Sequence, residues 1–172
     1  MKLEFDKNTT EFLKIIAKNA LENNTRVFFV GGFVRDYLLN KKTLDIDFLI
    51  QGNAIEFVKT LPFEIVSLHK DFCSAKVQYK GNIIDFASTR TEFYPNSACL
   101  PKLKKIGVDL LEDVKRRDYT INSLYLEIKL KNNNLDFDLI DLVKGVNDIK
   151  NKTLRSLHNK SYIDDPTRIL RG

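Results

Sequence analysis

The chain has 172 residues, of which 43% are hydrophobic and 30% charged, and this composition is ordinary for one globular domain. Its 28 Lys and Arg residues exceed its 23 Asp and Glu residues, and the formal charge of +5 suits an anionic partner such as RNA or a nucleotide. No apolar run approaches the ~20 residues that cross a bilayer, and the N-terminus lacks the apolar core of an export signal. We therefore expect a cytoplasmic protein. The two cysteines, Cys73 and Cys99, lack metal-binding spacing, and we expect each to be an idle thiol.

Helices and strands alternate in the first half of the chain. Apolar residues at helical spacing predict a first helix, which Thr9 or Thr10 caps and the Asn23-Asn24 pair ends. Gly81 supplies a hairpin-like turn between two later strands. The elements that follow the first helix are predicted as a strand over 26–30, a helix over 33–39, a strand over 44–50, a helix over 53–60, and strands over 63–68, 75–79 and 82–87.

The second half begins with an irregular segment over 91–108, in which Pro95 and Pro101 act as breakers. The sequence then predicts helical segments over 109–116 and 120–125, strands over 126–130 and 135–140, a short helix over 146–151, and a last helix that opens at Asp165-Pro166. This order favours an α+β fold, a mixed sheet with helices packed on one face.

A glycine pair stands between the strand over 26–30 and the helix after it. Gly31 and Gly32 would let the backbone approach a phosphate closely, and a helix N-terminus offers free N–H donors to an anion. Arg35 lies in the first turn of that helix and could bind the same anion. A plain strand-to-helix turn is the alternative interpretation.

Acidic residues alternate with apolar ones on the next strand. Asp45 and Asp47 share one face because successive side chains of a strand point to opposite faces, and two like charges so close repel each other. A pair of Mg²⁺ ions would relieve that repulsion. Asp85 lies on another predicted strand and could join the pair, with Arg90 close behind it. The alternative is a solvated surface pair. His69 and His158 lack metal-binding partners, and Asp136 and Asp138 lie on the predicted strand over 135–140.

Two further segments extend this pattern towards the C-terminus. Residues 116–124 read RRDYTINSL, and residues 164–171 read DDPTRILR. With the earlier GGFVRD and DID runs, they resemble the ordered signatures of class II tRNA nucleotidyltransferases and bacterial poly(A) polymerases, whose second signature is usually written RRDFTINAL and whose third begins EDPxRxLR. The turn from Asp141 to Asp148 is similar to the family's IDPFGGxxDL, from which Val143 and Asn147 depart. The likeness covers nearly the whole chain.

The resemblance implies a polymerase-beta-like nucleotidyltransferase palm. We expect a catalytic head domain over 1–160 and the start of a helical neck over 161–172, with the remainder missing, so that the chain is a head-domain fragment. The implied activity is transfer of CMP or AMP from CTP or ATP to the 3′ end of tRNA. Poly(A) polymerase is the alternative, and a non-catalytic nucleotide- or RNA-binding module is a second one. Which bases are added, whether the fragment is active alone and its oligomeric state stay open.

The resemblance also implies roles for particular residues. Asp45 and Asp47 would bind two Mg²⁺ ions, and Asp85 would complete the catalytic carboxylates. The residues expected to hold the incoming nucleotide are Gly31, Gly32, Arg35, Arg90, Arg117, Asp118, Asn122, Arg168 and Arg171. Of these, Arg168 and Arg171 could instead be solvated. An ion pair of Asp118 with Arg116 or Arg117 is the structural alternative for the second signature.

Overall fold

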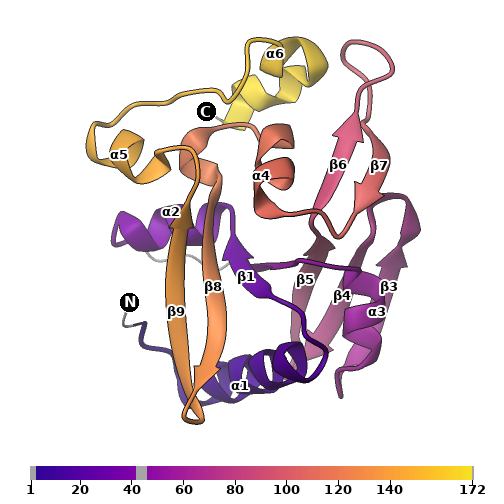
Figure 1. Cartoon of the computed structure of the whole chain (residues 1–172), viewed down its shortest axis with the longest axis vertical. Coiled ribbons are helices and arrows are strands. Elements are labelled where there is room, and N and C mark those ends of the chain that lie inside the picture. Colours follow the sequence, from indigo (N-terminus) through magenta and orange to yellow (C-terminus); the bar gives the residue numbers. More distant parts are fainter. Residues whose placement is uncertain (1–2, 42–45, 172) are drawn as a thin grey trace.

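The computed structural model describes residues 3–41 and 46–171 (Figure 1). Its first helix, α1 (Lys7–Glu22), begins at Asp6, whose carboxylate accepts hydrogen bonds from the backbone N–H groups of Asn8 and Thr9. The prediction that Thr9 or Thr10 caps this helix is therefore wrong: a carboxylate earlier in the chain already satisfies the free N–H donors and suits the positive end of the helix dipole. The helix ends at Asn23, as predicted.

The main sheet has seven strands in the spatial order β3-β4-β5-β2-β1-β8-β9. β2 and β5 run parallel, whereas the other neighbours are antiparallel, so the predicted mixed sheet is confirmed. Gly81 and the residue before it both have positive φ, which is the conformation of a tight hairpin turn. The strand bounds are β1 (Val27–Val30), β2 (Asp47–Ile50), β3 (Glu64–His69), β4 (Ser74–Tyr79), β5 (Asn82–Ser88), β8 (Leu124–Lys131) and β9 (Asn134–Asp141).

One face of this sheet carries the larger core. Helices α1, α2 (Gly32–Leu38) and α3 (Ala54–Lys59) pack on it, as predicted. The core is rich in aromatic rings: Phe48 of β2 stacks on Phe86 of β5, with 4.9 Å between ring centroids. This burial supplies the main apolar driving force of the fold.

The opposite face carries a smaller core that the pattern did not predict. Short helices α4 (Leu110–Asp113) and η2 (Val114–Arg116) place Leu110 and Val114 there, against Phe28, Leu49 and Tyr125 of the sheet. β1 and most of β2 are therefore buried on both sides. This second layer packs against Val30 and Leu49, at the end of the sheet where Asp47 pairs with Val30.

The segment over 91–108 is not irregular throughout. It contains a two-stranded sheet of β6 (Arg90–Phe93) and β7 (Lys102–Ile106), which the sequence failed to predict because the lysines of β7 obscure its alternation. The predicted helix over 120–125 is only the 3₁₀ turn η3 (Thr120–Asn122), since β8 begins at Leu124.

The last part of the chain forms short elements. They are α5 (Gly145–Lys150), α6 (Ser161–Asp164), and the 3₁₀ helix η4 (Pro166–Arg171), which opens where the Asp-Pro signal indicated. In the part of the chain that the structure describes, no helix is long and apolar enough to span a bilayer.

Candidate active site

Two carboxylates lie side by side on the central strands of the sheet. In the parallel pairing of β2 and β5, Asp47 stands directly opposite Asp85. Neighbouring strands are about 4.8 Å apart, so the two side chains share one face at close range. A Cβ placed on Gly31 would lie 3.9 Å from Asp47 Oδ2, which brings the glycine pair to the same place. Asp45, the other predicted carboxylate, lies outside the described residues.

Asp85 has a basic neighbour that the sequence did not predict. Lys76 of β4 pairs with it across the strands, with Nζ 3.0 Å from the carboxylate. The side chains of Lys76 and Asp85 are 40% and 46% exposed, so this ion pair is worth about 1 kcal/mol or less and is easily displaced. Asp85 is therefore available to a competing cation.

Gly31 follows the last residue of β1 and caps α2 with φ +66°, a conformation that strongly favours glycine. Helix α2 starts immediately after it and carries Arg35 in its first turn. Arg35 donates hydrogen bonds from Nε to Asp36 Oδ1 at 2.8 Å and from Nη1 to Asn122 Oδ1 at 2.7 Å. The last bond joins two sequence motifs that lie 87 residues apart.

The second motif, residues 116–124, runs from the end of η2 through η3 to the start of β8. The Asp118 carboxylate accepts a hydrogen bond from the backbone N–H of Tyr119 at 2.7 Å and lies 3.3 Å from Arg171 Nε. Asn122 Nδ2 also approaches Asp118, at 3.4 Å. Asp118 thus pairs with an arginine of the C-terminal segment, whereas both Arg116 and Arg117 pair with Asp113.

Asp113 is another site residue that the sequence reasoning missed. Its fully buried carboxylate accepts hydrogen bonds from Arg116 Nε and Arg117 Nε, both at 2.9 Å, from the backbone N–H of Arg90 at 3.1 Å and from the Tyr125 hydroxyl at 3.1 Å. Burial acts to raise its pKa, but the guanidinium groups of Arg117 and Arg116 outweigh burial, so the pKa lies below its ordinary value. Its spacing of three and four residues before two arginines was the available signal.

Arg168 is also buried, with 3% of its surface exposed. It donates from Nη2 to the carbonyl of Arg116 at 2.9 Å and from Nη1 to that of Arg117 at 3.2 Å, while the Tyr119 hydroxyl donates to the Arg168 carbonyl at 2.7 Å. These bonds fix the C-terminal segment against the second motif. The suggestion that Arg168 is merely solvated is therefore wrong. Arg171, whose side chain is half exposed, lies at the rim.

A cavity of about 410 Å³ opens among these elements. Its lining contains all nine residues that the sequence predicted to hold a nucleotide, from β1–α2, β6, the second motif and η4. Six of the residues around it are arginines, which suits a polyanionic ligand. In residues 3–41 and 46–171, no group of three His, Cys, Asp or Glu side chains could hold a metal ion. The Asp47–Asp85 pair is instead two oxygen-donor side chains of the kind that Mg²⁺ prefers.

Comparison with known proteins identifies the family of this chain. Residues 27–155 match the family model of the poly A polymerase head domain, and the chain belongs to that family. Over 150 residues it is 40% identical to an A-adding tRNA nucleotidyltransferase of Aquifex aeolicus, a match that covers 86% of this chain and 18% of that protein.

Solved structures show the same fold. An apo CCA-adding enzyme superposes with a TM-score of 0.79 at 39% identity, covering 97% of this chain and 39% of that one. A CCA-adding enzyme in complex with ATP superposes with a TM-score of 0.73 at 36% identity, covering 97% and 38%. The chain therefore spans well under half the length of the proteins it matches here.

Proposed function

We propose that this chain is the catalytic head of a template-independent RNA nucleotidyltransferase that adds AMP or CMP, from ATP or CTP, to the 3′ end of tRNA. The observation that carries the proposal is the cavity whose lining gathers all nine predicted nucleotide-binding residues beside Asp47 and Asp85. Relatives named for A addition to tRNA, and a related structure with bound ATP, support the substrate class. The cytoplasmic location also remains a prediction.

In this proposal Asp45 and Asp47 would hold two Mg²⁺ ions, and Asp85 would complete the catalytic carboxylates. Bound there, the ions would supply positive charge to the attacking 3′-hydroxyl and to the α-phosphate, and pyrophosphate would leave. Two of the three carboxylates share one face of adjacent strands, which supports the assignment. The exposed ion pair between Asp85 and Lys76 is weak, so a divalent cation can replace Lys76 there.

The chain's own residues then position the nucleotide. Gly31 and Gly32 bring the backbone close to the triphosphate, and Arg35 and Arg90 offset its charge. Asp118 can accept a hydrogen bond from the 2′-hydroxyl of the ribose, which distinguishes a ribonucleotide from a deoxyribonucleotide. Asn122 is held beside Asp118 by its hydrogen bond from Arg35, so the phosphate side and the ribose side of the cavity share one network.

Calorimetric titration with ATP and CTP, with and without Mg²⁺, tests this function. We expect Mg²⁺-dependent binding that Asp47→Asn abolishes. Asp138→Asn is the matched control, since Asp138 is an exposed carboxylate of β9 that pairs with Lys129 and lies outside the cavity. Binding that is unaffected by Asp47→Asn, or that is lost equally in the control, would refute the assignment.

A further inference from the structure

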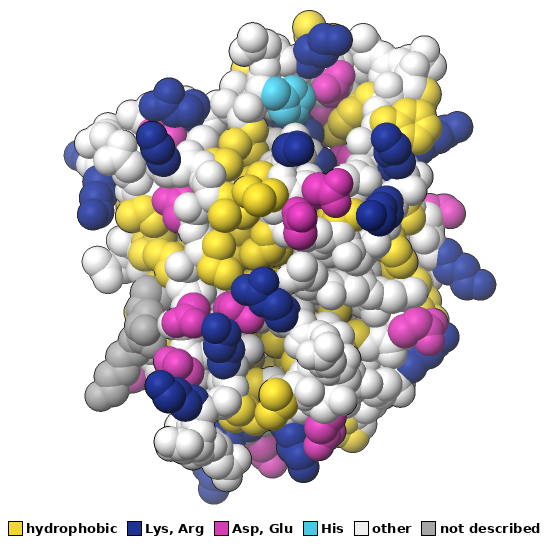
Figure 2. Space-filling model, in the orientation of Figure 1, with side chains coloured by type: hydrophobic (Ala, Val, Ile, Leu, Met, Phe, Trp, Pro, Cys, Tyr) yellow, Lys and Arg dark blue, Asp and Glu magenta, His cyan; other side chains and the backbone are white. Residues whose placement is uncertain are grey.

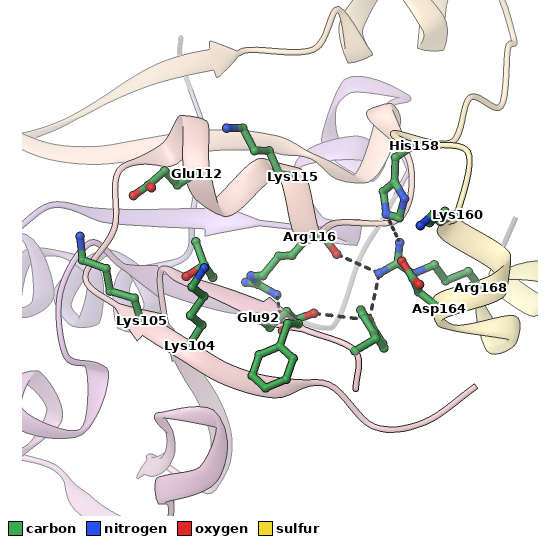
Figure 3. Close-up of a pocket in the computed structure, with 13 residues that line it drawn as sticks. Glu92, Lys104, Lys105, Glu112, Lys115, Arg116, His158, Lys160, Asp164 and Arg168 are labelled. Carbon is green, nitrogen blue, oxygen red and sulfur yellow. Dashed lines mark hydrogen bonds and ion pairs between the residues drawn. The ribbon is translucent and has the colours of Figure 1, made fainter. Parts of the chain in front are cut away.

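A second hollow lies beside the nucleotide cavity, and we call it the lysine groove. Its volume is about 590 Å³, and the β6–β7 hairpin, α4–η2 and the segment from His158 to Arg168 form its walls (Figure 3). It shares Glu92, Tyr94, Arg116 and Arg168 with the nucleotide cavity. A single layer of side chains therefore separates the two hollows.

The groove carries cations that are not neutralised. Lys104, Lys105, Lys115 and Lys160 line it, all four are exposed, and none forms an ion pair with a described residue. Figure 3 shows Lys104 and Lys105 on one side of the groove and Lys160 on the other, with Arg116 between them. The face that contains these elements carries many Lys and Arg side chains on its upper half (Figure 2). Such an arrangement raises the local concentration of an extended anion.

The acidic residues of the groove do not cancel this charge. The Glu92 carboxylate is already bonded to Arg90 Nε at 3.1 Å and lies 4.0 Å from Arg116 Nη1, and its side chain is 6% exposed. Glu112 and Asp164 remain, two carboxylates against four lysines. The exposed charge of the groove is therefore positive.

An exposed aromatic ring lies among these lysines. Phe93 of β6 lines the groove with 47% of its surface exposed, although a phenylalanine gains by burial. The neighbouring Tyr94 is committed to the wall, since its hydroxyl accepts a hydrogen bond from Arg168 at 3.1 Å. Proteins bind single-stranded nucleic acids with this combination of side chains, because the phosphates bind the lysines and an unpaired base stacks on the aromatic ring.

From these observations we propose that the lysine groove binds the single-stranded RNA nucleotides that directly precede the 3′ end. The inference rests on the proposed function, to which it adds a path for the RNA. A strand in the groove needs to cross only the shared wall to bring its terminal hydroxyl towards the α-phosphate of a nucleotide in the cavity. A duplex would not satisfy the groove, because its bases are stacked on each other and offer no free face to Phe93.

The experiment measures binding of a fluorescently labelled eight-nucleotide single-stranded RNA at a series of salt concentrations. Each phosphate contact on a single strand contributes about 0.7 to the slope of log K against log salt, so Lys105→Ala with Lys115→Ala should reduce the slope by about 1.4. Lys14→Ala with Lys150→Ala removes the same charge from two lysines outside the groove that form no ion pair with a described residue, and should leave the slope nearly unchanged. Phe93→Ala should weaken binding about fivefold or more without changing the slope, which is the loss of one stacked base.

Equal slopes of log K against log salt in the groove and control variants would overturn the proposal that the groove binds RNA. Absence of RNA binding by the unmodified protein would overturn it as well. Titration of the same variants with ATP and Mg²⁺ separates this failure from that of the proposed function. If the groove variants still bind the nucleotide and their RNA binding is also unchanged, only the proposal that RNA binds in the groove is refuted. A loss of nucleotide binding in the Lys105→Ala, Lys115→Ala variant would assign these lysines to the nucleotide and would also overturn the RNA path.

Discussion

The buried carboxylate of Asp113 makes the sharpest prediction about this fold. Asp113→Asn keeps the shape of the side chain but removes its charge and turns one acceptor into an NH₂ donor. Arg116 and Arg117, whose side chains are 16% and 12% exposed, would then face that donor with no other described carboxylate at hydrogen-bond distance, since Glu92 lies 4.0 Å from Arg116. Breaking a buried ion pair by removing one partner costs about 3–5 kcal/mol.

That cost is a large part of the ~5–15 kcal/mol that stabilises a typical domain. With a urea m-value of about 2 kcal/mol/M, the unfolding midpoint should fall by about 2 M, measured by circular dichroism. The exposed carboxylate of Asp138 serves as control, and Asp138→Asn should shift the midpoint by less than about 0.5 M. Adding Arg116→Met to Asp113→Asn should recover part of the loss, because one unpaired cation is gone. Equal midpoints for the two single variants would show that the four hydrogen bonds at Asp113 do not act as we describe.

Two further changes test other parts of the site. A Cβ on Gly145 would overlap the Thr120 carbonyl, so Gly145→Ala should destabilise the protein by about 1–3 kcal/mol and weaken nucleotide binding by displacing η3. Gly52→Ala is the control and should do neither, because the atom nearest to its added Cβ is 3.8 Å away. Chemical denaturation measures the stability and calorimetry the nucleotide binding, and equal behaviour of the two variants would contradict the packing argument. Burial and the nearby Arg168 lower the pKa of His158, so the folded state disfavours its protonation and stability should fall as the pH drops below about 6.5. In melting curves at pH 7.5 and pH 5.5, His158→Gln should reduce that fall, and an unchanged pH dependence would exclude His158 as its source.

Much of the fold could be predicted because its signals are local. The helical spacing before Asn23, the Gly81 turn and the Asp165-Pro166 start each act within a few residues, and the structure has each of them in place. The β6–β7 hairpin escaped prediction because its strands are short and half polar, so that no alternation distinguishes them from a loop.

The residues of the site also fall into those that the sequence could predict and those that it could not. Asp47, Asp85 and the nine cavity residues could be selected because they stand in ordered motifs. Lys76 could not, because its significance depends on the register of β4 against β5, which places it beside Asp85 only in three dimensions. Asp113 lies between these cases: its spacing was readable, but its burial depends on the second core that α4 forms.

The bonds of Arg168 have a consequence for dividing the chain into fragments. The carbonyls of Arg116 and Arg117 and the hydroxyl of Tyr119 all receive their partners from Arg168, a residue beyond position 160. An expression fragment ending at 160 would leave these groups, all beside the nucleotide cavity, without those partners, at a cost of about 1–3 kcal/mol for each group that stays buried. A binding-competent fragment should therefore extend through residue 171, and random truncation libraries should show a sharp loss of soluble protein between positions 171 and 160.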